Sequence, residues 1–148
     1  MTAFVALDDR NQPHHLVLGT DFEVPGPYAA EPLPAATPDS RVDGYTVALE
    51  GDPVAGQPAM LTLRITQNGS AVTDLEPYLG SVAHLTAFHE GDLQAVHMHP
   101  QAPEPADDPP AVAPMVHAEF PATGVCRVVI QFQTRGQLDT APITVVAR

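Results

Sequence analysis

The most telling absences in this sequence concern positive charge and large aromatic side chains. It contains no lysine and no tryptophan, has six arginines, and carries a formal net charge of −12 at pH 7. Proteins that bind nucleic acids or anionic membranes do so through basic patches. We therefore expect no nucleic acid and no membrane surface among its partners, while the acidity favours solubility and a raised local concentration of cations.

Long hydrophobic runs are absent as well. No apolar stretch approaches the roughly 20 residues that span a bilayer, so we expect no insertion into a membrane. The apolar run over 1–7 is short and is followed by Asp8 and Asp9, which is not the pattern of a secretory signal peptide. The chain is thus expected to be either cytoplasmic or exported with its signal already removed.

Cysteine occurs once, as Cys126, so no internal disulfide can form. It alternates with Val128, Ile130 and Phe132 on one face of a predicted strand. This apolar pattern predicts a buried, unreactive thiol and not a nucleophile or a metal ligand.

Proline, in contrast, is abundant, and eleven of its 17 residues lie in two stretches. The stretch over 25–40 predicts an extended linker. The stretch over 100–114 excludes a central strand and predicts a long, semi-rigid surface loop.

The periodicity between these stretches is that of β-strands. Tyr45, Val47 and Leu49 alternate with more polar residues, and a second alternating run over 59–66 leads to Asn68-Gly69, a strong hairpin signal. A helical turn is expected only over 74–80. Further strands are predicted over 71–74, 82–89, 93–99, 115–120, 125–134 and 138–147, with a turn at Gly136. The fold class is therefore predicted to be all-β, an antiparallel β-sandwich.

Residues 1–24 are interpreted as a separate unit, an N-terminal β-hairpin that resembles the remnant of a preceding domain. An isolated hairpin is marginally stable in water, so we expect it to pack on the sandwich or to pair with a neighbouring domain or another chain. The predicted organisation is thus a hairpin over 1–24, a proline-rich linker over 25–40 and a sandwich domain over 41–148.

Histidines gather in one part of the predicted sandwich. If Glu90-Gly91 forms a two-residue turn, His84 falls opposite His97, and His97 and His99 point to the same face. Neutral imidazoles suit copper or zinc better than calcium or magnesium. The sequence therefore predicts a transition-metal site.

The loop over 100–114 returns the chain to this region and delivers Met115 and His117 as further ligands. Met98 is expected on the opposite face from its two histidine neighbours, so we rank it below them. The plainer interpretation is that these histidines are surface residues, because a histidine in a strand is more often exposed or hydrogen-bonded than a ligand.

The stretch over 72–85, DLEPYLG followed by His84-Leu85, together with the His97-Met98-His99-Pro100 segment, resembles a bacterial family of extracytoplasmic β-sandwich proteins. Its members are mostly uncharacterised and some are described as heavy-metal- or copper-associated. A second block over 117–142 extends the resemblance to residues 41–147. It implies an immunoglobulin- or cupredoxin-like sandwich that is exported, with His84, His97, His99 and His117 at recurrent histidine positions. Met98, where a small aliphatic residue is usual, would soften such a site toward Cu(I).

The function predicted from these features is a non-catalytic, extracytoplasmic metal-binding module that buffers or transfers copper, with zinc as the second choice. His84, His97 and His117 would supply nitrogen ligands, His99 a fourth ligand or a supporting contact, and Met98 and Met115 softer sulphur ligands. The alternative is a metal-free structural or protein-interaction domain. We expect no enzyme, because the sequence lacks HExxH, P-loop, nucleophile-elbow and dinucleotide motifs.

Overall fold

The computed structural model describes residues 2–7, 13–18, 20, 23–37, 39–101 and 113–148. These form two compact units, Met1–Pro32 and Leu33–Arg148. The described residues contain strands and no helix, so the predicted all-β class is confirmed. None of their secondary-structure elements is a helix suited to crossing a membrane. The predicted loop over 100–114 lies largely outside the described residues.

The first unit contains a hairpin of strands β1 (Thr2–Leu7) and β2 (Pro13–Leu18), which pair antiparallel. The second unit contains one antiparallel sheet. Its strands are β3 (Asp39–Val42), β4 (Tyr45–Glu50), β5 (Pro58–Gln67), β6 (Ser70–Ala71), β7 (Leu75–Glu76), β8 (His84–His89), β9 (Ala95–Pro100), β10 (Met115–Glu119), β11 (Gly124–Thr134) and β12 (Gln137–Ala147).

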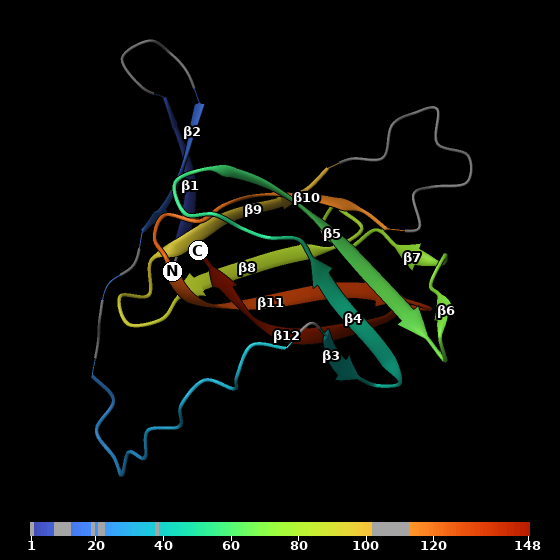
Figure 1. Ribbon diagram of the computed structural model, residues 1–148, viewed down its shortest axis with the longest axis horizontal. Coiled ribbons are helices and arrows are strands. Elements are labelled where there is room, and N and C mark those ends of the chain that lie inside the picture. The colour runs from blue at the N-terminus through green and yellow to red at the C-terminus, as the bar shows by residue number, and fades with distance from the viewer. Residues whose placement is uncertain (1, 8–12, 19, 21–22, 38, 102–112) are drawn as a thin grey trace. The chain divides into compact units, whose positions relative to one another are not determined.

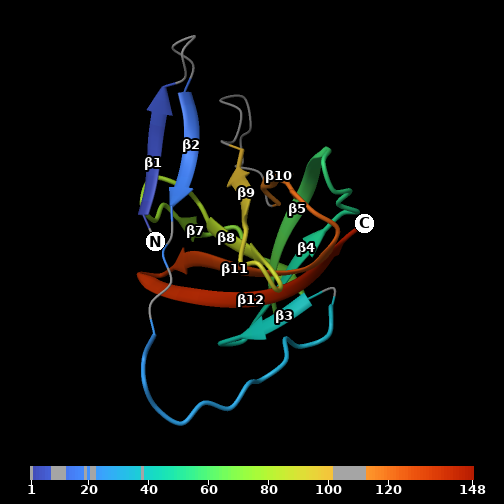
Figure 2. The same ribbon diagram turned by 90° about the vertical axis from the view of Figure 1, so that its left-hand side faces the viewer.

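The strands of the second unit follow the order β12-β11-β8-β9-β10-β5-β4-β3, with β6 beside β5 and β7 beside β11. The two ends of this order, β12 and β3, contact each other, so the sheet is nearly closed into a barrel. Figures 1 and 2 show the sheet curling until β3 lies beside β12. The predicted antiparallel sheet is therefore confirmed, and its form is a nearly closed barrel.

The barrel interior holds the apolar side chains that the alternation predicted. Val47 of β4, Leu63 of β5 and Phe132 of β11 are fully buried. Cys126 is fully buried with them, as predicted, and burial raises the pKa of its thiol. Because strand residues alternate between faces, each inward position leaves its neighbours on the outer surface of the barrel.

Two-residue turns with both residues at positive φ join several neighbouring strands. Asn68-Gly69 connects β5 to β6 and Arg135-Gly136 connects β11 to β12, so both predicted turns are confirmed. Asp43-Gly44 connects β3 to β4 in the same way. Positive φ at both positions is the signature of the type I′ turn, whose twist matches that of paired strands.

Three local expectations were wrong. The stretch over 74–80 is not a helical turn: it contains β7, and Tyr78 and Ser81 form a β-bridge around Leu79-Gly80. β3 begins at Asp39, so the last residues of the predicted linker belong to the sheet.

The third wrong expectation concerns the turn between β8 and β9. His89 bonds through its backbone N–H to the carbonyl of Gln94, so the turn spans 90–93 instead of Glu90-Gly91 alone. The ladder pairs Ala87 with Val96, a shift of two residues from the predicted register. His84 is therefore not opposite His97.

Candidate functional site

The outer face of β10 presents His117. Val116 and Ala118 on either side of it are fully buried, so the His117 side chain points out of the barrel. Its side chain is 25% exposed, and its Nε2 lies 3.9 Å from Oε1 of Glu119 on the same face. That distance is too long for a hydrogen bond but close enough for attraction when the ring is protonated.

The neighbouring strand β9 presents His97 and His99 on the same outer face. Val96 is buried and Met98 packs against the core. Because side chains alternate between faces, His97 and His99 point outward. The prediction that His97 and His99 share a face and that Met98 lies on the other is confirmed.

The register between β9 and β10 brings the three histidines together. His117 pairs directly with His99, and Glu119 pairs with His97. The ring centroids of His99 and His117 are 5.3 Å apart, and those of His97 and His99 are 5.1 Å apart. We call these three residues the outer histidine cluster.

One nitrogen of the cluster is notable. The Nδ1 atom of His117 is buried and, among the described residues, has no hydrogen-bond partner. A buried polar atom without a partner costs about 1–3 kcal/mol. Rotation of the ring would expose this nitrogen, and its lone pair could then bind a ligand.

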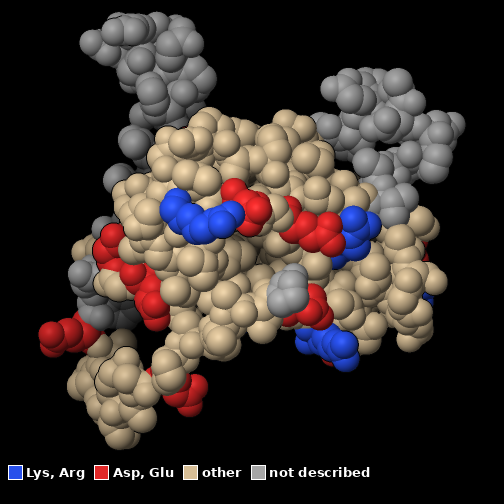
Figure 3. Space-filling model, in the orientation of Figure 1, with Lys and Arg blue, Asp and Glu red and all other residues tan. Residues whose placement is uncertain are grey.

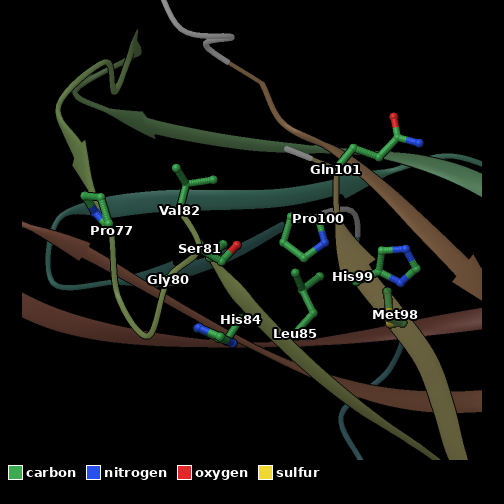
Figure 4. A pocket seen from close by; sticks show the side chains of 11 residues that line it. Pro77, Gly80, Ser81, Val82, His84, Leu85, Met98, His99, Pro100 and Gln101 are labelled. Carbon is green, nitrogen blue, oxygen red and sulfur yellow. The ribbon is translucent and has the colours of Figure 1, made fainter. Parts of the chain in front are cut away.

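His84 is not part of the outer histidine cluster, although it and His99 line the same cleft. It sits on β8 opposite Gln131 of β11, and its Nε2 donates to the backbone carbonyl of Tyr78 at 2.7 Å. Its ring also meets the Tyr78 ring edge-on, with centroids 5.6 Å apart. Figure 4 shows the His84 side chain directed away from His99.

A cleft of about 440 Å³ lies between the start of β8 and the end of β9. Leu85, Met98 and Pro100 contribute apolar walls, and His99 stands at its border (Figure 4). His99 therefore belongs both to the outer histidine cluster and to the rim of this cleft.

The three methionines of the described residues divide between the two faces of the sheet. Met98 packs against the core from the inner face. Met115 is 39% exposed on the outer face of β10, and the Thr62 hydroxyl donates to its Sδ at 3.6 Å. Met60 of β5, which sequence reasoning missed, pairs directly with His117 and is 44% exposed.

The sequence indicated only weakly that Met60 belongs near the histidines. Its position in the alternating run over 59–66 marks Met60 as outward-facing, but its proximity to His117 depends on pairing of β5 with β10. Those strands are far apart in the chain, so no local pattern reveals their register.

The electrostatic surroundings are acidic, and several arginines are neutralised by carboxylates. Arg64 pairs with Glu50 at 3.0 Å and Arg135 with Asp74 at 3.3 Å. Figure 3 shows arginine side chains bordered by carboxylates on the visible face. The net charge of −12 is therefore not offset by a broad basic patch on that face.

The histidine side chains are suitable ligand types for a transition metal, but they are not arranged around a common point. In the part of the chain that the structure describes, no group of three or more histidine, cysteine, aspartate or glutamate side chains is arranged to hold a metal ion. His99 and His117 form the best-placed pair, and a third ligand would require a side chain to turn.

The chain belongs to the family described as Domain of unknown function (DUF8832), whose model matches residues 40–148. No curated protein and no solved structure matches the chain.

Proposed function

Proceeding from membership in a family without an assigned activity, we propose that this protein is a non-catalytic metal-binding module for copper, with zinc as the second choice. His99 and His117 are its primary ligands, and His97 is the nearest third. The observation that carries the proposal is the direct cross-strand pairing of His99 with His117 on an outer face.

The spacing of the rings supports this proposal. A metal–nitrogen bond is about 2.0–2.1 Å long, so two imidazoles on one tetrahedral ion place their ring centroids about 5 Å apart. The centroid separations in the outer histidine cluster are 5.3 Å for His99 and His117 and 5.1 Å for His97 and His99. Binding would therefore need ring reorientation and no movement of the strands.

The surrounding chemistry also supports it. The Nδ1 of His117 has no hydrogen-bond partner among the described residues, so a bound ligand would offset the cost of burying it. Neutral imidazole favours Cu²⁺ above Zn²⁺ in the usual divalent order. The acidic surface raises the local concentration of cations.

The biological setting is part of the same proposal. A module that binds copper without catalysing a reaction buffers the ion or transfers it. We propose that it does so outside the cytoplasm, because the sequence resembles extracytoplasmic proteins. His84 is left out of this site, because its side chain is directed away from His99 (Figure 4). The hairpin over 1–24 remains our candidate for contact with a neighbouring domain or chain.

Calorimetric titration of chelator-treated, untagged protein tests the proposal. His99→Ala and His117→Ala should each weaken Cu²⁺ binding at least about tenfold, the loss expected for one removed ligand. Binding should also weaken on acidification, because only the neutral imidazole coordinates.

Two controls make the test specific. His84→Ala should leave the affinity unchanged, and a His14→Ala/His15→Ala double variant should remove only adventitious binding by adjacent histidines. Equal binding by wild type, His99→Ala and His117→Ala would refute the proposal.

A metal-free interaction domain is the second candidate. It is favoured by the lack of a ready-made group of metal ligands in the described residues. Titration of the wild type that yields no binding of copper or zinc would support this candidate instead.

We also propose that the barrel is a variant of an immunoglobulin- or cupredoxin-like sandwich. The spatial order β11-β8-β9-β10 supports this, because three consecutive strands with a fourth returning beside the first make a Greek key, which most β-sandwiches contain. An experimental structure with two facing sheets would bear it out.

A further inference from the structure

The outer histidine cluster borders two exposed methionine side chains that the proposed function does not use. Met60 is 44% exposed and Met115 is 39% exposed, in a chain with four methionines in all. Methionine is an apolar residue that ordinarily fills gaps in a core. Two of them on the outer face beside a histidine therefore call for an explanation.

The strand register places Met60 in line with the histidine pair. His117 pairs with His99 on one side and with Met60 on the other. Side chains directly opposite each other in an antiparallel sheet have Cβ atoms about 4.5–5.5 Å apart. His99, His117 and Met60 thus form a row across β9, β10 and β5, with His117 at its centre.

Met115 flanks the same row. It lies two residues from His117 on the same face of β10, opposite Thr62 of β5. Its Sδ accepts a hydrogen bond from the Thr62 hydroxyl at 3.6 Å, so this sulphur is directed toward β5, the strand that carries Met60. Both methionines therefore lie on the same outer face as His117, Met60 directly across from it and Met115 two positions along β10.

We infer that Met60, with Met115 beside it, completes a Cu(I) site with His99 and His117. This inference rests on the proposed function and specifies its metal. Two imidazole nitrogens and one or two thioethers form a soft, uncharged donor set, which selects Cu(I) over zinc and over harder cations. Among the described residues the other two sulphur atoms are excluded from this site, because Met98 and Cys126 face the barrel interior.

The test is an anaerobic competition of Cu(I) against a coloured Cu(I) chelator, with Cu²⁺ and Zn²⁺ titrations run in parallel. Met60→Leu preserves the size and apolar character of the side chain and removes the sulphur. It should weaken Cu(I) binding about tenfold and leave Cu²⁺ and Zn²⁺ binding unchanged. Met98→Leu is the matched control and should leave Cu(I) affinity unchanged.

X-ray absorption of the Cu(I)-loaded protein provides a second readout that does not depend on affinity. Copper–sulphur scattering should be present in the wild type and lost in a Met60→Leu/Met115→Leu double variant.

The outcomes separate this inference from the proposed function. Copper binding that needs His99 and His117 but shows no sulphur scattering and no effect of Met60→Leu overturns the inference alone. Binding of no metal, or binding that is independent of both histidines, overturns both.

Discussion

At the scale of single residues, both ring nitrogens of the His89 side chain have hydrogen-bond partners. Its Nδ1 lies 2.8 Å from Oδ1 of Asp92, and its Nε2 lies 3.1 Å from the carbonyl oxygen of Thr123. Both partners are acceptors, so both ring nitrogens must carry hydrogen for both bonds to form. The hydrogen bond to Asp92 first, and that to Thr123 second, raise the pKa of His89.

Asp92→Asn should therefore lower the pKa of His89, because it removes the largest cause of the upward shift. A histidine whose folded pKa exceeds its unfolded value contributes stability that is complete below the unfolded pKa. That contribution disappears as pH rises through the folded pKa. As pH rises above about 6.5, the ordinary pKa of histidine, wild-type stability should fall more than that of Asp92→Asn.

Nuclear magnetic resonance titration of the His89 ring and urea denaturation at several pH values measure both effects. Glu90→Gln is the matched control, since Glu90 contributes the smallest of the causes that raise this pKa. An unchanged pKa of His89 in Asp92→Asn would contradict the prediction.

At the scale of elements, type I′ turns fix the register of the hairpins. Asn68 has φ 51° and Gly69 has φ 79°, both in the left-handed region. Glycine adopts that region freely, and asparagine tolerates it better than most residues. The turn residues thus determine which face of β5 and β6 each following side chain occupies.

Gly69→Ala should destabilise the protein by about 1–2 kcal/mol, the cost of a left-handed conformation for a residue with a Cβ. A Cβ built at Gly69 meets no atom within 4 Å, so backbone strain is the whole effect. Gly26→Ala is the control, because it too meets no atom and its φ is not left-handed. Thermal or urea denaturation compares the two, and equal stabilities would rule out strain at Gly69.

The candidate site depends on elements that local patterns do not connect. Alternation alone predicted that His97 and His99 share a face, and this holds because period two is a property of each strand. The residue opposite His84 could be predicted only from the length of the turn over 90–93, in which Leu93 has φ 55°. A leucine in that conformation is uncommon, so the sequence offered no sign of the longer turn.

At the scale of the whole second unit, the sequence predicted strands and buried positions better than it predicted their neighbours. Val47, Leu63 and Phe132 were assigned to the core by periodicity, and all are fully buried. The pairing of β5 with β10 and the contact of β12 with β3 join segments distant in the chain. Those pairings depend on how the sheet curls, which hydrophobic alternation does not encode.

Asp139 is a buried carboxyl group on β12, the strand that contacts β3 where the barrel nearly closes. It is 2% exposed, and its Oδ1 accepts a hydrogen bond from the Gln137 side chain at 3.3 Å. Its Oδ2 is buried and accepts no hydrogen bond from the described residues, and the neighbouring Asp43 carboxylate is an acceptor to which only protonated Asp139 can donate. Burial first, and then Asp43 of the β3–β4 turn, raise the pKa of Asp139.

Asp139→Asn should consequently stabilise the barrel at neutral pH. A carboxyl whose folded pKa is raised contributes stability below its unfolded pKa, about 3.9, and loses it as pH rises through the folded pKa. The variant should be more stable than wild type by about 1–2 kcal/mol at pH 7 and by much less near pH 4. Asp43→Asn keeps the turn, because Asn-Gly suits type I′ geometry, and should give a smaller gain by removing only the neighbouring charge. Urea denaturation at both pH values measures this, and an Asp139→Asn variant less stable than wild type at pH 7 would mean that the ionised carboxylate supports the closure of β12 against β3.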